Sequence, residues 1–546
     1  MPIPTTGAWP PPSHAPAYDS YRDWDAWYVG DPDKLRAVYQ GRGLNGQNVP
    51  PSQRTYPGQY AGGVVGRFSR WLWGAPPPAD RRDGRLHVPL PADMAATAAN
   101  LLFSEPPTLT APATQKGGKG NAKVQERLEL LAEDGLSRTL LHGAEAGSVL
   151  GDTYLRPVID REVSPRAFLT AVHADGALPT IRWEKLIEVT FWSCVGVDGN
   201  THYRLLEHHD VVKGAGRIVY RLHEGTADKL GKNIGLKAMD ETKPLAEVTD
   251  ADGVQVTGLD RLDVVRVPNA GPQRRWRTMS TLKYLGRSDF DGNEQLFDRL
   301  DDTWTSWMQD LFIARGRIIV PAYMLQKAPN GQGQGAEFDP HREIYQAMQA
   351  LPNMQGGGSG APITAVQFNI RHEEHKATAD ALVEQALQHA GLSSQTMGDQ
   401  ADGVPVTATE VQQRERQSYM TRGNRIQTWV PAIADSVELL LAVERAAGMS
   451  DLEPVKPNVE FGDSVSEAPE TVARTVSLLD AAHAISTETK VRMVHPDWDD
   501  TEVGEEVRKI LDEQRVENAD SFNGDFGNGG SAGGGSDPDG EDESGQ

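Results

Sequence analysis

Apolar residues recur at three- and four-residue steps between residues 292 and 314, which is the spacing of one face of a helix. At about 1.5 Å per residue, this helix is about 35 Å long. We expect its apolar stripe to pack against protein and its acidic face to meet water. The stripe consists of Leu296, Phe297, Leu300, Trp304, Trp307, Met308 and Leu311. The acidic face consists of Glu294, Asp298, Asp301 and Asp302.

Two further helices have clear end signals. One covers residues 374–390, with Gly391 as its C-terminal cap. The other is a long helix that begins at Thr407, because Glu410 three residues later closes a capping box. The polar loop 391–406 lies between them, and the long helix carries Arg414, Arg416, Arg422 and Arg425. The candidate contact residues of the loop are Ser394, Gln395, Asp399 and Gln400.

Residues 317–321 and 363–370 have the composition of short strands and enclose two glycine-rich runs. They predict a small β-rich module between the first two helices. Farther upstream, strands alternate between residues 147 and 267, with Asp198-Gly199 and Asp252-Gly253 as hairpin signals.

The remaining helices are shorter, and the two termini differ from the rest of the chain. Helices are expected at 33–40, 85–105, 125–146, 469–484 and 500–515. The Pro-rich N-terminus is expected to be extended up to about residue 17, and the aromatic residues at 18–28 to pack against a neighbouring element. Residues 516–546 contain no Lys or Arg and are rich in Gly and acids, which predicts disorder. The fold class is therefore α+β.

Composition limits the classes of function. A chain of 546 residues exceeds one compact core and suggests three or four packed regions. The single cysteine, Cys194, excludes an intrachain disulfide and a multi-cysteine zinc site, and we expect it to be buried. No uninterrupted apolar run reaches about 18 residues and no signal peptide is evident, so no membrane is expected and the protein is predicted to be made in a cytoplasm.

Enzymatic motifs are weak. His208, His209 and Asp210 could supply metal ligands, but adjacent histidines on a strand point to opposite faces, and the sequence identifies no carboxylate partner. The pair His372 and His375 lacks the spacing of a zinc protease helix, and residues 117–120 lack the Ser or Thr of a P-loop. No catalytic residue, metal or cofactor is therefore predicted. A metal-dependent nucleic-acid enzyme that uses His208, His209 and Asp210 stays as the alternative.

Six blocks in order along the chain resemble the portal proteins of tailed double-stranded DNA phages, most closely the siphovirus type of actinobacterial phages. The blocks are R-L-H-V-P-L-P-A-D-M-A-A-T-A-A-N-L-L-F-S-E-P-P (85–107), R-L-L-E-H-H-D (204–210) with R-L-H-E-G-T-A-D-K-L-G (221–231), G-R-S-D-F (286–290), G-L-S-S-Q-T-M-G (391–398), T-A-T-E-V (407–411) and A-I-S-T-E-T-K-V-R-M-V-H-P-D-W (484–498).

The resemblance implies a homo-oligomeric ring, usually of twelve subunits, with wing, stem, clip and crown regions around a DNA channel. It assigns a wing to 18–285, stem helices to 286–314 and 374–390, a clip to 315–373, a tunnel loop to 391–406, a long supporting helix and a return strand of the wing to 407–464, and a crown to 465–515.

It also implies a function and partners. Such a ring stands at one capsid vertex of the virion and passes the genome during packaging and ejection. Its partners are the terminase large subunit, head–tail adaptors, the major capsid and scaffolding proteins, and non-specifically passing double-stranded DNA. The net charge of -23 is compatible with DNA that passes without being bound. A virion structural protein without a channel is a further alternative.

Overall fold

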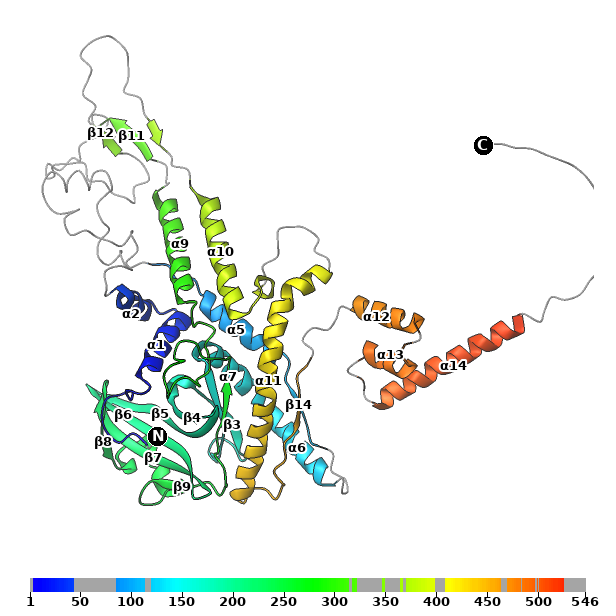
Figure 1. Cartoon of the computed structure of the whole chain (residues 1–546), viewed down its shortest axis with the longest axis horizontal. Coiled ribbons are helices and arrows are strands. Elements are labelled where there is room, and N and C mark those ends of the chain that lie inside the picture. Colours follow the sequence, from blue (N-terminus) through cyan, green and yellow to red (C-terminus); the bar gives the residue numbers. More distant parts are fainter. Residues whose placement is uncertain are drawn as a thin grey trace, which may run out of the picture. The chain divides into compact units, whose positions relative to one another are not determined.

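The computed structural model describes residues 3–43, 85–112, 119–313, 317–321, 346–348, 364–366, 370–397, 408–462, 469–482, 484–495, 498 and 500–524. It divides into two compact units, Met1–Gly462 and Asp463–Gln546. Helices and sheets are both present in the first unit, which confirms the mixed class (Figure 1).

A six-stranded antiparallel sheet in the order β4-β5-β6-β7-β8 forms the largest β element, and β9 pairs with β7. Its strands are β4 (Ala177–Arg182), β5 (Lys185–Asp198), β6 (Thr201–Val212), β7 (Ala215–Thr226), β8 (Lys229–Ile234) and β9 (Val254–Val256). Asp198 and Gly199 join β5 to β6 as predicted, and the left-handed φ of 58° at Gly199 suits this tight turn.

Two expectations for this region are wrong. Gly253 lies in a turn in which the Val254 carbonyl accepts from Asp250 N at 3.0 Å; this turn follows a short helix and precedes β9, so it does not join two adjacent strands of the sheet. Cys194 is exposed, and it lies where the pairing of β5 with β6 shifts register.

A second sheet has the order β10-β2-β3, from β10 (Val265–Pro268), β2 (Asp152–Val158) and β3 (Phe168–His173). The short connecting helices are η1 (Ala174–Gly176), η2 (Leu236–Ala238), η3 (Asp240–Thr242) and α8 (Leu245–Val248).

The N-terminal helices are more extensive than predicted. They are α1 (Ala15–Val29), α2 (Pro32–Gly43), α5 (Leu90–Phe103), α6 (Lys119–Glu133) and α7 (Leu136–Leu150). The aromatic segment 18–28 is itself a helix, so the extended N-terminus ends before residue 17. The helix expected at 125–146 is two helices, because Gly135 takes a left-handed φ of 94° between them.

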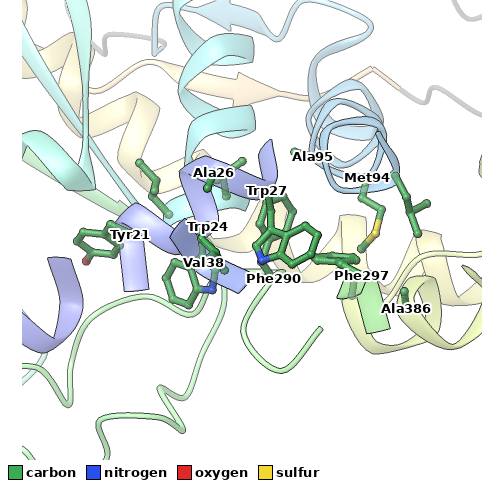
Figure 2. Packing of buried hydrophobic residues seen from close by; sticks show 14 of the residues in the cluster. Tyr21, Trp24, Ala26, Trp27, Val38, Met94, Ala95, Phe290, Phe297 and Ala386 are labelled. Atoms are coloured by element: carbon green, nitrogen blue, oxygen red, sulfur yellow. The ribbon is translucent and has the colours of Figure 1, made fainter. Parts of the chain in front are cut away.

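Two apolar clusters make up most of the core of the first unit. Trp24 and Trp27 of α1 pack with Phe290 and with Phe297 of α9 (Glu294–Ile313) in the first cluster, which also contains Ala386 (Figure 2). The second cluster joins α5, α6 and α7 to the apolar face of the longest helix, α11 (Ala408–Ala446). Its residues on α11 include Trp429, Ile433, Val437, Leu440 and Leu441.

The predicted helix pair and strands are present. α10 (His372–Ala390) packs on α9, and Gly391 caps α10 with a φ of 77°. β11 (Arg317–Pro321) and β13 (Thr364–Val366) lie within the two predicted strands, and the structure pairs them antiparallel. β11 also pairs parallel with β12 (Gln346–Met348), which was not predicted.

After residue 397, α11 runs through Pro431 to Ala446, and β14 (Asn458–Glu460) then returns to pair with β1 (Thr108–Thr110). The proposed capping residue Thr407 lies outside the described residues. By length and composition alone, one helix in the described part of the chain, Glu415–Ala446, could cross a membrane. Trp429, Ile433, Val437, Leu440 and Leu441 of this helix belong to the second core cluster, as residues of a core helix do.

The second unit contains α12 (Pro469–Ala481), α13 (Thr487–Val494) and α14 (Asp500–Gly524). α13 was not predicted, although Ser486 is a regular N-cap whose Oγ accepts from Thr489 N at 3.2 Å. Since α14 continues to Gly524, the expectation of disorder is wrong for residues 516–524, and residues 525–546 lie outside the described residues.

Candidate functional site

The acidic face at the start of α9 is covered by protein. Glu294 is buried, and its carboxylate accepts from Trp24 Nε1 at 3.1 Å and from Gly292 N at 2.9 Å. Arg275 forms an ion pair with the same carboxylate. Glu294 therefore fastens the first turn of α9 to α1.

Asp301 is the most enclosed of the four acidic residues, with only 1% of its surface exposed. Its carboxylate accepts from the hydroxyl of Tyr39 at 2.8 Å and from the backbone N of Val88 at 2.9 Å, and it contacts His87 Nδ1 at 3.0 Å. Three donors from two other segments thus satisfy one buried carboxylate, as burial of a charge requires.

Arg85 bridges the other two carboxylates. Its Nη2 lies 2.9 Å from an oxygen of Asp298 and 2.9 Å from an oxygen of Asp302, and its guanidinium stacks 4.1 Å from the Tyr39 ring centre. Burial raises the pKa of Asp302, and Arg85 opposes that shift. The expectation that this face meets water is therefore wrong, because basic and aromatic residues distant in sequence cover it. The residues concerned are Glu294, Asp298, Asp301 and Asp302.

The apolar stripe of α9 divides into a covered part and an exposed part. Leu300 is buried, and Leu296 and Trp304 pack against the first core cluster. Trp307 stacks on His375 of α10 with ring centres 6.0 Å apart. Leu311 is 40% exposed and Met308 is 41% exposed, so the described residues cover the end of the stripe only in part.

α9 and α10 run antiparallel, since they are joined by polar contacts at both ends. Asp310 pairs with Arg371 at 2.8 Å and with His375 at 3.0 Å, and the hydrogen bond from His375 lowers the pKa of Asp310. At the other end, Asn293 Nδ2 donates to the Ala386 carbonyl at 3.2 Å.

The segment after α10 is anchored to α11. The Gly391 carbonyl accepts from Thr421 Oγ1 at 2.7 Å, and Ser393 N donates to Ser418 Oγ at 2.8 Å. A Cβ on Gly391 would lie 2.4 Å from Thr421 Oγ1, so this position requires glycine both for its φ and for space.

Ser394 and Gln395 lie in the 3-10 turn η5 (Ser394–Met397) and are half-buried against α5, α10 and α11. Their prediction as contact residues of the loop stays a prediction, and in the single chain both are partly covered. Asp399 and Gln400 lie outside the described residues, and sequence reasoning had no signal for the contacts of η5.

The arginines of α11 that the structure describes have different environments. Arg425 is buried and pairs with Asp289 at 2.6 Å, where Ser148 Oγ also donates to the carboxylate at 2.5 Å. Arg422 donates to the carbonyl of Leu101 at 2.7 Å. Arg416 is exposed, and the side chain of Arg414 lies outside the described residues. Arg422 and Arg425 therefore hold α11 to the rest of the unit.

The two adjacent histidines of β6 have separate surroundings, as the alternation of a strand predicts. His209 contacts Asp263 at 2.8 Å and Glu207 at 3.1 Å. Burial alone would lower the pKa of His209, but these two carboxylates raise it to about 9. The pKa of Glu207 falls to about 2, because His209 and Arg156 outweigh the opposing effect of burial.

On the other face, His208 Nε2 lies 3.4 Å from an Asp210 oxygen and 3.9 Å from a Glu188 oxygen. Burial lowers the pKa of His208 to about 4, so the ring is neutral at pH 7. His209 does not join this group, so the set of His208, His209 and Asp210 proposed from the sequence is not brought together. Glu188 was missed because the sequence did not give the register between β5 and β6.

Comparisons with known proteins place these elements in a family. No curated protein matches the chain. A chain from the neck of an empty GTA particle, computed with C6 symmetry, is 15% identical, with 79% of this chain and 99% of that chain covered and a TM-score of 0.38. A chain from the neck of the native GTA particle, computed with C12 symmetry, is 14% identical at the same coverage, with a TM-score of 0.33. The model of the SPP1 Gp6-like phage portal proteins matches residues 17–520, and the chain therefore belongs to the SPP1 Gp6-like family of phage portal proteins.

Proposed function

We propose that copies of this chain assemble into a closed ring, whose central channel passes double-stranded viral DNA at one vertex of the capsid. The observation that carries this proposal is the family match over residues 17–520, which covers both helices of the α9–α10 pair and the long helix α11. The family consists of structural proteins, which supports a mechanical rather than a catalytic role.

In this proposal the antiparallel pair α9 and α10 is the stem and residues 315–373 are the clip. The wing covers residues 18–285, and α11 with β14 supports the stem from 407 to 464. The crown covers residues 465–515. The length and pairing of α9 and α10 support the stem assignment, because contacts at both ends make the pair a stiff unit.

The buried acidic residues of α9 are proposed to have a structural role, in place of the solvent-facing position expected from the sequence. Since Glu294 and Asp301 are enclosed by their own chain, we assign them to holding the stem on the wing rather than to lining the channel. The exposed end of the stripe at Leu311 is the part that a neighbouring subunit would cover, because an apolar side chain there gains from burial.

The loop 391–406 is proposed to reach the channel. Its first residues are anchored on α11 through Ser418 and Thr421, so η5 acts as a fixed base. Asp399 and Gln400 follow this base and are the candidate contact residues. Neither the Gln400 amide nor the Asp399 carboxylate carries a positive charge that could neutralise a DNA phosphate. Their contacts with DNA would therefore be brief and independent of sequence.

We further propose that the ring contains twelve subunits. Its partners in this proposal are the terminase large subunit, head–tail adaptors, and the major capsid and scaffolding proteins. The test of the ring is a set of class averages of the purified full chain by electron microscopy. Rings with a central hole are expected, and monodisperse particles without a hole would contradict the channel.

The test of the loop is packaging. Removing residues 398–403 should leave the rings intact, because the anchored base at 391–397 is retained. It should reduce DNA packaging in vitro. Normal genome filling by intact rings of this variant would exclude the loop from the channel while leaving the ring itself unaffected.

A further inference from the structure

Three side chains that differ in sequence position and in chemistry meet on one face of the large sheet. Glu188 comes from β5, and His208 and Asp210 come from β6. One ligand atom from each lies within 4.8 Å of the other two. His208 is 3% exposed and Asp210 is 8% exposed, so the group is enclosed within the protein.

The two distances from His208 are longer than those of most hydrogen bonds. His208 Nε2 is 3.4 Å from the Asp210 oxygen and 3.9 Å from the Glu188 oxygen, whereas an N–H donor normally lies 2.7–3.2 Å from its acceptor. Two ligands bound about 2.1 Å from a tetrahedral zinc ion are about 3.4 Å apart. The spacing of 3.4 Å between His208 and Asp210 matches this value, and the spacing of 3.9 Å to Glu188 is somewhat wider.

The orientation of His208 also suits a ligand. Thr190 Oγ1 contacts His208 Nδ1 at 2.8 Å, which leaves Nε2 directed to the two carboxylates. A hydrogen bond to the second ring nitrogen is the usual way in which proteins fix a metal-binding histidine. Thr190 stands opposite His208 in the β5–β6 register, so the sheet itself holds this contact.

A neighbouring guanidinium fixes the Asp210 carboxylate. Asp210 pairs with Arg217, with Nε at 2.6 Å and Nη2 at 2.9 Å from its two oxygens. The Arg217 bonds hold the Asp210 carboxylate in place, as second contacts of metal-binding carboxylates do. The Glu188 side chain is 20% exposed, which provides access from solvent.

We propose that Glu188, His208 and Asp210 bind a divalent transition-metal ion with the ligand preferences of Zn²⁺. One imidazole and two carboxylates form a hard-to-borderline donor set that suits zinc and manganese better than calcium, which takes oxygen ligands alone. The ion would join β5 to β6 and act as a structural clamp in the sheet. The proposed metal site does not depend on the proposed DNA channel.

The test uses the full chain, treated with EDTA, dialysed, and titrated with Zn²⁺ by calorimetry. We expect one tight equivalent per chain and a higher melting temperature with zinc. Glu188→Gln removes one charged ligand at a partly exposed position, and it should weaken zinc binding at least tenfold with no change in the fold. His208→Gln should abolish the tight equivalent.

The matched control is His372→Gln, which removes an exposed histidine near a carboxylate outside the group. This variant should bind zinc as the unmodified chain does. Circular dichroism verifies that Glu188→Gln is folded. If this folded variant still bound one zinc ion tightly, the assignment would be wrong. The same conclusion would follow if the unmodified chain took up no zinc, or if His372→Gln alone lost it.

Discussion

Replacing Asp289 with alanine tests the central connection between the long helix and the stem. Asp289 lies just before α9 and Arg425 lies on α11, and both side chains of this 2.6 Å ion pair are 6% exposed. Asp289 also accepts from Ser148 and, at 3.0 Å, from Asn269 Nδ2. The substitution therefore leaves a buried guanidinium and two polar groups without their acceptor.

Breaking a buried ion pair from one side costs about 3–5 kcal/mol, because the remaining charge is neither solvated nor paired. We expect Asp289→Ala to lower the free energy of unfolding of the first unit by that amount. Urea denaturation followed by tryptophan fluorescence measures the change, since Trp24, Trp27 and Trp429 are buried in this unit.

Two further variants make the measurement specific. Asp19→Ala removes one partner of an exposed pair with Arg22, which should cost at most about 1 kcal/mol. The double change Asp289→Leu with Arg425→Met should recover part of the loss, because it removes both buried charges. A loss below about 1 kcal/mol for Asp289→Ala, or a double variant that loses as much as the sum of the single changes, would refute the reasoning.

Three other predictions concern assembly, a turn and pH. Leu311→Asp should prevent rings without changing the melting temperature of the single chain, whereas Gln309→Asp on the same helix should still form rings in light scattering. Gly391→Ala should destabilise the chain by about 1 kcal/mol or more, because its φ is 77°, and Gly423→Ala within α11 should stabilise it by up to about 1 kcal/mol in the same urea assay. The folded pKa of His209, about 9, exceeds its ordinary value of 6.5, so its stabilisation is complete below pH 6.5 and is lost as the pH rises through 9. The melting temperature should fall over that window and should fall less in His209→Gln; equal slopes would contradict the assignment.

The local sequence pattern was sufficient to predict those helices and turns whose spacing or capping residues lie within the element itself. The three- and four-residue spacing of Leu296, Leu300 and Trp304 predicted α9, and Gly391 marked the end of α10. The Asp198-Gly199 turn joined the two strands it was expected to join. Such signals succeed because backbone geometry and the period of a helix are fixed by neighbouring residues.

The surroundings of these elements could not be predicted in the same way. Periodicity shows which residues share a face, but not what covers that face, so Asp301 was expected in water although Tyr39 and Val88 enclose it. Val88 and Tyr39 are 213 and 262 positions from Asp301, so they meet it only after the chain has folded. No sequence pattern encodes the distance between them.

The same limit applies to the group around His208. Alternation along β6 already separated His208 from His209, which is a local property of any strand. The pairing of β5 with β6 then brought Glu188 within 3.9 Å of His208, and no motif encodes that register. The sequence by itself thus determined the family, the helices and the faces of the strands, whereas tertiary structure decided which charges are buried and which side chains meet, because burial and contact depend on segments that are remote along the chain.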